Sequence, residues 1–425
     1  MKKILYSIFL FGVALSITSC LHDDDKIFGT PAAERIEQAV DSDKTLLESA
    51  SNGWELHLWT GEQYSSGGYT YLMKFKNNKV TVGSDFAPSG HYSTSSYDVI
   101  KDQGPVLTIN TYNEIFHELA TPTMSDDDGE QQDYEFVIMR TTPDSIYLKG
   151  KKWGNKMVMT RLADSVNWDN RIAVLNSMVD NLKVNYNVFV TGKKMGSVNL
   201  DPSRVMNITT DSATQKMPFY ITATGIHLLN PVSIDGKTCQ NFNYNDEAMT
   251  LTCSDAGASE VVFNAIFMKY EDYAGSYKLN YDKGASLSVK LVPAGDGKTY
   301  NLVGLMNNVP MKLNYNKNDG TLSWLSQDIG TLSNGDHVWL AAWDIADGGY
   351  LYFDPKFGLT LSLDADAPGT TLLFKSFGPY SDFTTDSFIL WEVTSTGSSV
   401  GQFNGILFTN KTNRLRYLNS MVKTN

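Results

Sequence analysis

The chain has 425 residues, 42% of them hydrophobic, and a formal net charge of −12. This length is enough for two or three domains, each with a core of its own. Nucleic acid is excluded as an expected partner, because an acidic surface repels phosphate backbones and the sequence holds no lysine and arginine cluster with interleaved aromatic residues.

The first twenty residues have the layout of a secretory signal. Lys2 and Lys3 precede a largely apolar run from Ile4 to Ile17, which is too short to cross a bilayer, so we expect residues 1–19 to be removed. Residues 17–20 (ITSC) resemble the lipobox of bacterial lipoproteins, in which the cysteine is diacylated. Cys20 is then the lipid-attachment site and the mature N-terminus; in the alternative, an ordinary signal peptide, Cys20 is incidental.

Residues 20–29 form the predicted tether between the lipid and the folded chain. The run Leu21–Asp25 contains three aspartates and resembles the export tag that sends lipoproteins of Bacteroidota to the outer leaflet of the outer membrane. The alternative is a plain solvated linker. Two or three acyl chains on one cysteine hold a protein firmly at a membrane. We therefore expect a lipid-anchored protein of the outer membrane that faces the extracellular side.

A helix followed by short strands is predicted for a first domain of residues 30–163. Thr30 is a suitable N-cap and Pro31 a suitable first helical residue, and apolar residues recur at helical spacing as far as Gly53, so a helix is predicted over about residues 30–51. From there to Leu162 the hydrophobicity alternates with a period of two. About eight short strands are predicted, a number that can close into a small barrel.

A second amphipathic helix, over about residues 166–183, is predicted within a middle region of short strands that covers residues 164–270. The third region, residues 271–425, contains further short strands separated by turns rich in glycine and asparagine. Its Gly275-Ser-Tyr sequence is similar to the Gly-x-Trp that opens lipocalin barrels. The predicted fold class is mainly β, with antiparallel short-strand domains built as lipocalin-like barrels or as sandwiches.

Cys239 and Cys253 are a predicted disulfide pair. The environment outside the cytoplasm is oxidising and permits the bond. If residues 245–247 turn a hairpin, Cys239 lies directly opposite Cys253, at a separation that a disulfide can bridge.

Features along the whole chain are similar to those of one protein family. The lipobox and the acidic run are followed by residues 33–36 (AERI), 52–54 (NGW), 133–136 (DYEF) and 150–152 (GKK). Together they resemble the lipoprotein family of gut Bacteroidota known as domain of unknown function 4302. The resemblance covers most of the mature chain. It implies a surface lipoprotein in the neighbourhood of nutrient-uptake systems, and it implies no activity and no catalytic residue.

The sequence contains no motif for catalysis, nucleotide binding or metal binding. The six histidines lack the spacing of a zinc site, and there is no nucleophile elbow, Walker loop or dinucleotide fingerprint in a strand-to-helix context. The acidic run at residues 126–130 lacks the alternating ligands of an EF-hand loop. We therefore expect no metal and no cofactor, and we assign no catalytic residue.

Aromatic residues are the remaining candidates for a binding site. Exposed rings can stack on sugars or line the mouth of a barrel, although aromatic residues of strands more commonly pack in the core. Four crowd the first domain and two fall on one face of a single strand in the third: Trp54, Trp59, Tyr69, Tyr71, Trp339 and Trp343.

The leading functional hypothesis is a non-catalytic surface protein. Its ligand is a glycan, a small apolar molecule or a partner from an outer-membrane import complex. One alternative is a polysaccharide-acting hydrolase whose carboxylate pair cannot be recognised from sequence spacing. Another is a structural or adhesive surface protein whose barrels are filled by side chains.

Overall fold

The computed structural model describes residues 31–425 except 103, 123–126, 211–212, 283, 347, 368–369, 381, 406–407 and 425. The predicted signal, Cys20, the tether and the predicted cap Thr30 lie outside the described residues. The chain divides into two compact units, and the division falls after Asn176. No helix of the described ranges is long and apolar enough to cross a bilayer.

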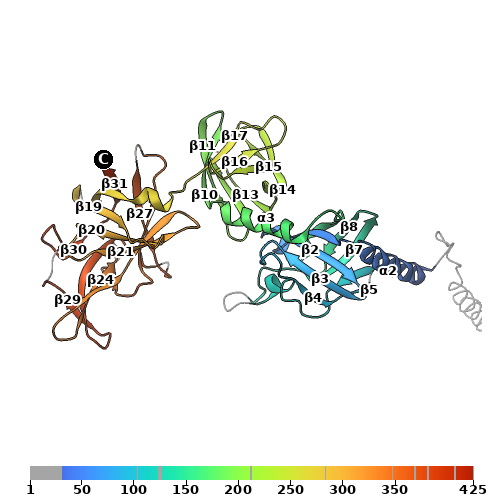
Figure 1. Ribbon diagram of the computed structural model, residues 1–425, viewed down its shortest axis with the longest axis horizontal. Helices are drawn as coiled ribbons and strands as arrows, with labels where there is room; N and C mark the ends of the chain where they lie inside the picture. Colours follow the sequence, from blue (N-terminus) through green and yellow to red (C-terminus); the bar gives the residue numbers. More distant parts are fainter. Residues whose placement is uncertain are drawn as a thin grey trace, which may run out of the picture. The chain divides into compact units, whose positions relative to one another are not determined.

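The first unit is built on one nine-stranded antiparallel sheet with the order β4-β3-β2-β1-β9-β8-β7-β6-β5 (Figure 1). Its two end strands, β4 and β5, are separated in the chain by Tyr97 alone, so the sheet curls until its ends meet and forms a nearly closed barrel. The strands are β1 (Trp54–Trp59), β2 (Gly68–Lys76), β3 (Lys79–Ser84), β4 (Ser93–Ser96), β5 (Asp98–Lys101), β6 (Pro105–Thr108), β7 (Glu135–Thr142), β8 (Ser145–Gly150) and β9 (Lys156–Arg161).

Helix α2 (Ala32–Glu48) packs against β2, β5 and β6. The helix begins at Ala32, and Pro31, with φ −57° and ψ 147°, is its N-cap and not the first helical residue as predicted; its missing N–H costs nothing at this end of the helix. Leu47 is fully buried, and its carbonyl accepts a hydrogen bond from Trp54 Nε1 at 2.9 Å. The predicted amphipathic helix over about residues 30–51 is therefore confirmed.

Helix α3 (Trp168–Asn181) confirms the second predicted helix. Asn167 caps it, because its Oδ1 accepts a hydrogen bond from the Asn170 N–H at 2.8 Å. Arg171 then forms a bidentate ion pair with Glu55 of β1, at 2.9 and 3.0 Å. This pair fixes the start of the helix on the sheet of the first unit.

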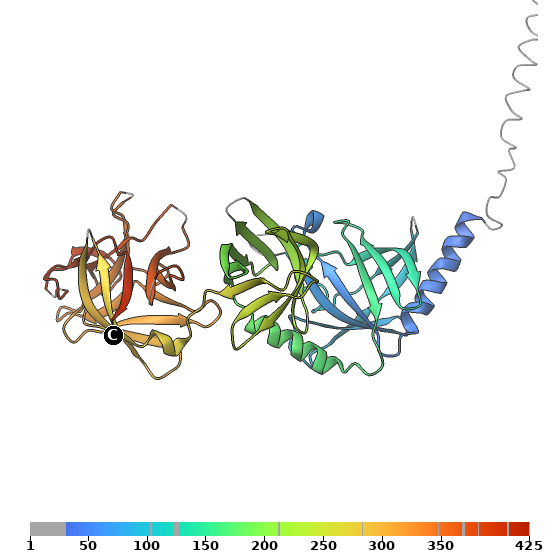
Figure 2. The same ribbon diagram turned by 90° about the horizontal axis from the view of Figure 1, so that it is seen from above.

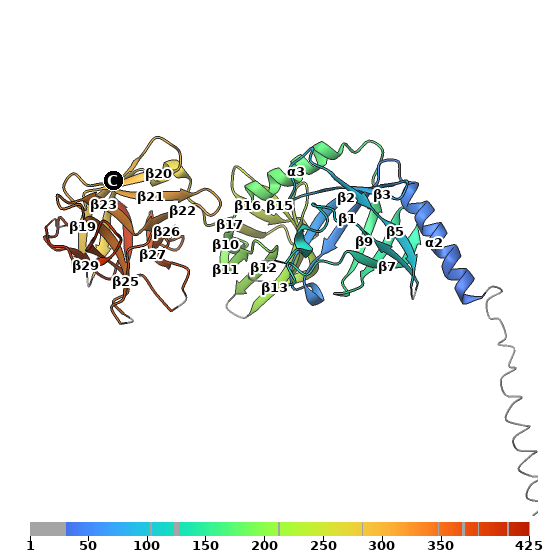
Figure 3. The same ribbon diagram turned by 90° about the horizontal axis from the view of Figure 1, so that it is seen from below.

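The second unit begins with a closed antiparallel barrel of eight strands, in which β17 pairs with β10 (Figures 2 and 3). Its strands follow each other in sequence order around the barrel: β10 (Asn185–Val190), β11 (Lys193–Leu200), β12 (Val205–Thr210), β13 (Thr214–Ile221), β14 (Gly225–Ile234), β15 (Lys237–Asn245), β16 (Thr250–Cys253) and β17 (Val261–Ala265).

The remaining strands form a second closed barrel of eight strands and a separate six-stranded sheet. The barrel contains β18 (Gly275–Tyr281), β19 (Ala285–Pro293), β20 (Thr299–Val303), β21 (Met311–Asn316), β22 (Thr321–Leu325), β26 (Gly358–Leu363), β27 (Thr371–Phe377) and β31 (Ser420–Thr424). The six-stranded sheet contains β23 (Gln327–Thr331), β24 (His337–Trp343), β25 (Leu351–Tyr352), β28 (Ser387–Val393), β29 (Ser399–Gln402) and β30 (Arg414–Leu415).

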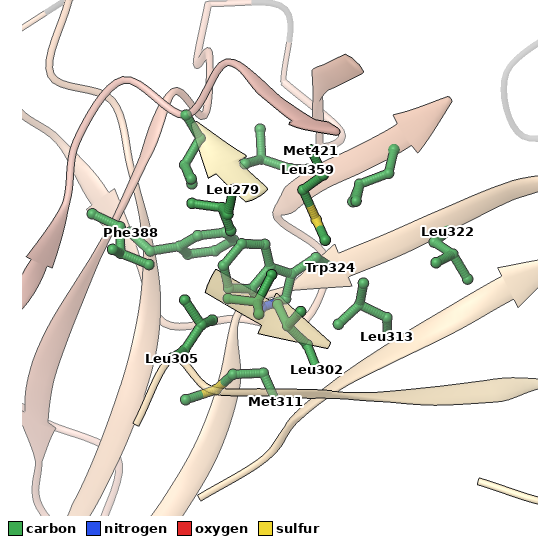
Figure 4. Packing of buried hydrophobic residues seen from close by; sticks show 14 of the residues in the cluster. Leu279, Leu302, Leu305, Met311, Leu313, Leu322, Trp324, Leu359, Phe388 and Met421 are labelled. Carbon is green, nitrogen blue, oxygen red and sulfur yellow. The ribbon is translucent and has the colours of Figure 1, made fainter. Parts of the chain in front are cut away.

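One hydrophobic core joins this barrel to the inner face of the six-stranded sheet. Trp324 of β22 is fully buried, and its ring centroid lies 4.6 Å from that of Phe388 on β28 (Figure 4). Leu340 and Ala342 of β24 belong to the same cluster. The barrel is therefore packed with side chains, and the other face of β24 and β28 points away from the core.

The predicted fold class is confirmed as mainly β. Three of the four sheets are barrels, two closed and one nearly closed, and the fourth is the separate six-stranded sheet. The first sheet has nine strands where about eight were expected. The proposed division into domains at residues 163/164 and 270/271 stays a prediction.

Candidate functional site

Four of the six candidate aromatic residues lie in the core of the first unit. Trp54 and Tyr71 are 0% exposed, and Trp59 and Tyr69 are 8% and 7% exposed. The Tyr71 ring packs against Phe116 at a centroid distance of 5.2 Å. Because protein atoms cover these rings, the expectation that they stack on a ligand is corrected: they are packing residues.

The other two candidates, Trp339 and Trp343, lie on the outer face of β24. Side chains alternate along a strand, and Leu340 and Ala342 point into the core. The two tryptophans therefore point the opposite way, and both are partly exposed. Ala341, fully buried, lies between them on the same face.

Trp391 of β28 completes this surface, and it was not among the sequence candidates. In the antiparallel pairing of β24 with β28, Trp339 is directly opposite Trp391, and Ala341 is opposite Ile389. Residues directly opposite each other share a face of the sheet. We name the surface formed by Trp339, Trp343 and Trp391 the tryptophan face; Ala341 and Ile389 form its buried floor.

Hydrogen bonds from the indole N–H groups fix the orientation of two of the three tryptophans. Trp391 Nε1 donates to Ser399 Oγ at 2.9 Å, and Trp343 Nε1 donates to the Gly349 carbonyl at 3.1 Å. An indole fixed by its N–H loses little conformational freedom when a ligand covers its ring. The tryptophan face is therefore partly organised before any ligand binds.

Polar side chains border the tryptophan face on both sides. On β23, Asp328 is directly opposite Trp339, and its Oδ2 lies 2.6 Å from His337 Nδ1. On the other side, Gln402 of β29 is opposite Trp391, and its Oε1 accepts a hydrogen bond from Arg414 Nη2 at 2.6 Å. We call Asp328, His337, Gln402 and Arg414 the polar rim.

A cavity of about 530 Å³ lies beside Arg414. The Arg414 guanidinium carbon is also 5.6 Å from the centroid of the Trp343 ring, so one side chain borders both the cavity and the tryptophan face. The cavity wall contains hydroxyl, amide and charged groups, among them Tyr281, Asp282, Asn404, Lys411 and Arg416.

The two cysteines lie close together, but not in the predicted register. Phe242, not Cys239, is opposite Cys253, so the predicted hairpin register is wrong. Both thiols are buried and unbonded in the structure: Cys239 Sγ donates a hydrogen bond to the Lys237 carbonyl at 3.8 Å, and Cys253 Sγ donates one to Asp255 Oδ2 at 3.4 Å. Burial raises the pKa of the Cys239 thiol. The disulfide itself stays a prediction.

The carboxylates that the structure describes do not assemble a metal centre. No group of three or more histidine, cysteine, aspartate or glutamate side chains among the described residues could hold an ion. Asp344 is 1% exposed and accepts a hydrogen bond from the Thr384 N–H at 2.8 Å, which is a structural role. Asp126 and Asp347, in two acidic stretches of the sequence, lie outside the described residues.

Comparisons with known proteins give a family but no activity. The sequence model of a family described as "Domain of unknown function (DUF4302)" matches residues 24–246, more than half of the chain, and that of a second domain of unknown function (DUF4987) matches residues 254–391. A search of the curated proteins found no match.

A solved structure described as "The Structure of Intact Ap-TbpB (N and C lobes)" covers 87% of this chain and 76% of its own, with 10% sequence identity. Its TM-score of 0.13 is too low to support an argument about fold or function. The family resemblance read from the sequence is nevertheless confirmed by the family model. The chain belongs to the DUF4302 family, with a DUF4987 domain in its C-terminal part.

Proposed function

We propose that this protein is a non-catalytic, lipid-anchored surface protein of a member of the Bacteroidota, and that it binds a glycan on the tryptophan face. The observation that carries the proposal is the cross-strand pair of partly exposed tryptophans, Trp339 and Trp391, bordered by the polar rim. The lipid anchor at Cys20 and the outward-facing outer-membrane location are part of the same proposal, and they rest on the signal and the acidic tether.

The chemistry of the surface matches that of a sugar. A pyranose ring has an apolar face of C–H groups and an edge of hydroxyl groups. An indole covers the apolar face, while side chains with fixed donors and acceptors bind the hydroxyls. The polar rim supplies a carboxylate, an imidazole, an amide and a guanidinium next to the indoles. These groups are already paired with each other, but a purely apolar ligand would cover their remaining donors and acceptors without offering a hydrogen bond.

The spacing of the tryptophans favours an oligosaccharide over a monosaccharide. Trp339 and Trp343 are four residues apart on one strand, which corresponds to about 13 Å. This distance exceeds the length of one pyranose ring. Trp391 extends the surface sideways by one strand. Several sugar units can therefore contact the tryptophan face together.

Binding of the full mature chain to a glycan array, followed by titration calorimetry on the glycans that bind, tests the proposal. We expect Trp339→Ala and Trp391→Ala each to weaken binding about tenfold or more, because each removes a stacking surface worth more than 1 kcal/mol. Trp153→Ala is the matched control, since Trp153 is a partly exposed tryptophan of the first unit. Circular dichroism checks that each variant folds.

Three results would reject this function. The first is an array on which no glycan binds. The second is glycan binding that is unchanged in the Trp339→Ala, Trp391→Ala double variant. The third is turnover of a bound polysaccharide, which would replace the binding function with the alternative, a hydrolase. If no glycan binds and an import-complex protein is crosslinked at the tryptophan face, that partner is the ligand.

A further inference from the structure

We propose that the glycan bound at the tryptophan face carries anionic groups, carboxylates or sulfates, and that one of them enters the cavity beside Arg414. This inference rests on the proposed function above and narrows its ligand to acidic saccharides. It comes from the charges of the cavity wall and from the position of Arg414 between the cavity and the indoles.

The cavity is locally positive in an acidic protein. Lys411, Arg414 and Arg416 line it, and Asp282 is the one carboxylate in its wall. The whole chain carries a formal charge of −12, so its overall field repels anions. A concentration of cations in a concave site of such a chain focuses the potential locally and favours an anionic group there.

Two of the three cations are not neutralised by the protein. Arg416 forms an ion pair with Asp282, with 2.7 Å between Nη2 and Oδ2. Arg414 is hydrogen-bonded to the neutral amide of Gln402, and among the described residues neither Arg414 nor Lys411 has a carboxylate partner. Their charges are therefore available to a ligand.

The loop that carries these cations is held in place by its own hydrogen bonds. Asn410 Oδ1 accepts the N–H of Thr412 at 3.0 Å, and Asn410 Nδ2 donates to the Tyr281 hydroxyl at 3.1 Å. Asn413 is 6% exposed, and its Nδ2 donates to the Phe403 carbonyl at 2.8 Å. Such bonds fix the backbone of the cavity wall, which lowers the entropic cost of binding.

Arg414 links the cavity to the sugar-binding surface. Its guanidinium group lies against Trp343 and also borders the cavity. A sugar ring stacked on Trp343 would place a ring substituent next to this guanidinium group. Carboxylates and sulfates carry a negative charge and accept paired hydrogen bonds from a guanidinium group. A hydroxyl or a methyl ester is neutral and forms only weaker hydrogen bonds with it.

The test compares matched charged and neutral glycans on the full mature chain. The probes are polygalacturonate oligomers against their methyl esters, and sulfated galactan oligomers against the same oligomers after desulfation. We expect the charged member of a pair to bind about tenfold more tightly or better, with affinity that falls as salt is raised. The first pair reports on carboxylates and the second on sulfates.

Variants then locate the preference. Lys411→Gln should weaken binding of the charged probe by about tenfold and leave binding of its neutral counterpart unchanged. Arg414→Gln should weaken binding of the charged probe more than binding of the neutral one, because Arg414 also belongs to the polar rim. Lys290→Gln, an exposed lysine of β19, is the matched control. Trp339→Ala should weaken binding of both probes.

The outcomes separate this inference from the proposed function. Equal binding of charged and neutral probes, lost in Trp339→Ala, overturns the anionic ligand and leaves the glycan-binding function standing. A charge preference that survives both Lys411→Gln and Arg414→Gln also overturns it, because the cavity is then not its source. If neither member of either pair binds and the glycan array shows no binding, both proposals fall.

Discussion

Replacing Asp255 by alanine should destabilise the middle barrel by a predictable amount. Its carboxylate accepts three hydrogen bonds from β15: from the main-chain N–H of Gln240 at 2.6 Å, from the main-chain N–H of Asn241 at 2.8 Å, and from the Asn241 side-chain amide at 2.6 Å. Asp255→Ala removes the acceptor for all three donors. At this point of the barrel the carboxylate accepts main-chain hydrogen bonds that the carbonyl groups of a neighbouring strand would otherwise accept.

The expected cost is about 3 kcal/mol. A hydrogen bond to a charged group contributes about 1.5–3 kcal/mol when buried, but Asp255 is partly exposed, so we count about 1 kcal/mol for each bond. For the second unit, which spans residues 177–425, this change in the free energy of unfolding lowers Tm by about 6–12 °C. Asp255→Asn keeps one acceptor oxygen and should give a smaller loss.

The effect should also depend on pH. Burial raises the pKa of Asp255, but the hydrogen bonds from Asn241 and Gln240 outweigh burial and lower the pKa to about 2. For a carboxylate with a lowered pKa, the stabilisation is present above the pKa of the unfolded chain, about 3.9, and is lost as pH falls through the folded value. The difference in Tm between the natural chain and Asp255→Ala should therefore shrink between pH 4 and pH 2.

Thermal unfolding followed by circular dichroism at pH 7, 4, 3 and 2 measures both effects. Asp246→Ala is the control, because Asp246 is an exposed acid at the neighbouring hairpin turn and should change Tm by less than about 2 °C. Two results would contradict the reasoning: a Tm of Asp255→Ala equal to that of the control at pH 7, or a loss of Tm in Asp255→Ala that is the same at every pH. Either would show that the Asp255 carboxylate does not stabilise β15.

Three further predictions concern the core, the cysteines and the lipid. Trp324 Nε1 is buried and has no hydrogen-bond partner among the residues that the structure describes. Trp324→Phe should therefore cost only about 1 kcal/mol in denaturant unfolding, whereas Trp324→Ala should cost about 3–5 kcal/mol; a costly Trp324→Phe would show that the indole N–H does have a partner. Natively exported protein should contain a Cys239–Cys253 disulfide in non-reducing mass spectrometry, since the two buried cysteines lie on the paired strands β15 and β16; two free thiols would contradict this. Cys20→Ala should abolish incorporation of labelled palmitate and move the protein out of the membrane fraction; unchanged fractionation would contradict the lipid anchor.

Local signals in the sequence were enough to predict the helices and the fold class. The spacing of apolar residues that predicted α3 depends on neighbours in the chain, as does the Asn167 side chain that caps this helix. The hairpin between β2 and β3 has an equally local cause, because it turns at Asn77 and Asn78, which adopt positive φ values of 51° and 59°.

The predicted cysteine register failed because the hairpin loop begins one residue later and is one residue longer than expected. Asn245 pairs with Thr250, so the loop contains four residues and not the expected three. Met249, the last of them, has a φ of 53°. Methionine is seldom found in the left-handed region, whereas asparagine or glycine there would have marked the longer turn.

The sequence predicted only part of the tryptophan face, because the periodicity of a strand shows which of its residues share a face but not which other strand lies beside it. Alternation along β24 placed Trp339 and Trp343 together. Trp391 joins them through a pairing of strands that are far apart in the sequence. Burial of Trp54 and Tyr71 was equally invisible, since a period of two does not reveal which face of a strand packs in the core.

The junction at Tyr97, between β4 and β5, bears on how copies of this protein interact when they are crowded together. A hydrogen bond of 3.2 Å from the Asn110 N–H to the Ser96 carbonyl ties the end of β4 to the chain beyond β6, and Tyr97 N–H donates to the Asn78 carbonyl. Main-chain groups that a flat sheet would leave open along its margins are thus satisfied within the same molecule. If the proposed lipid anchor concentrates many copies in two dimensions, they meet one another often. The three barrels, whose sheets close or nearly close on themselves, then offer neighbouring copies few free strand edges to pair with.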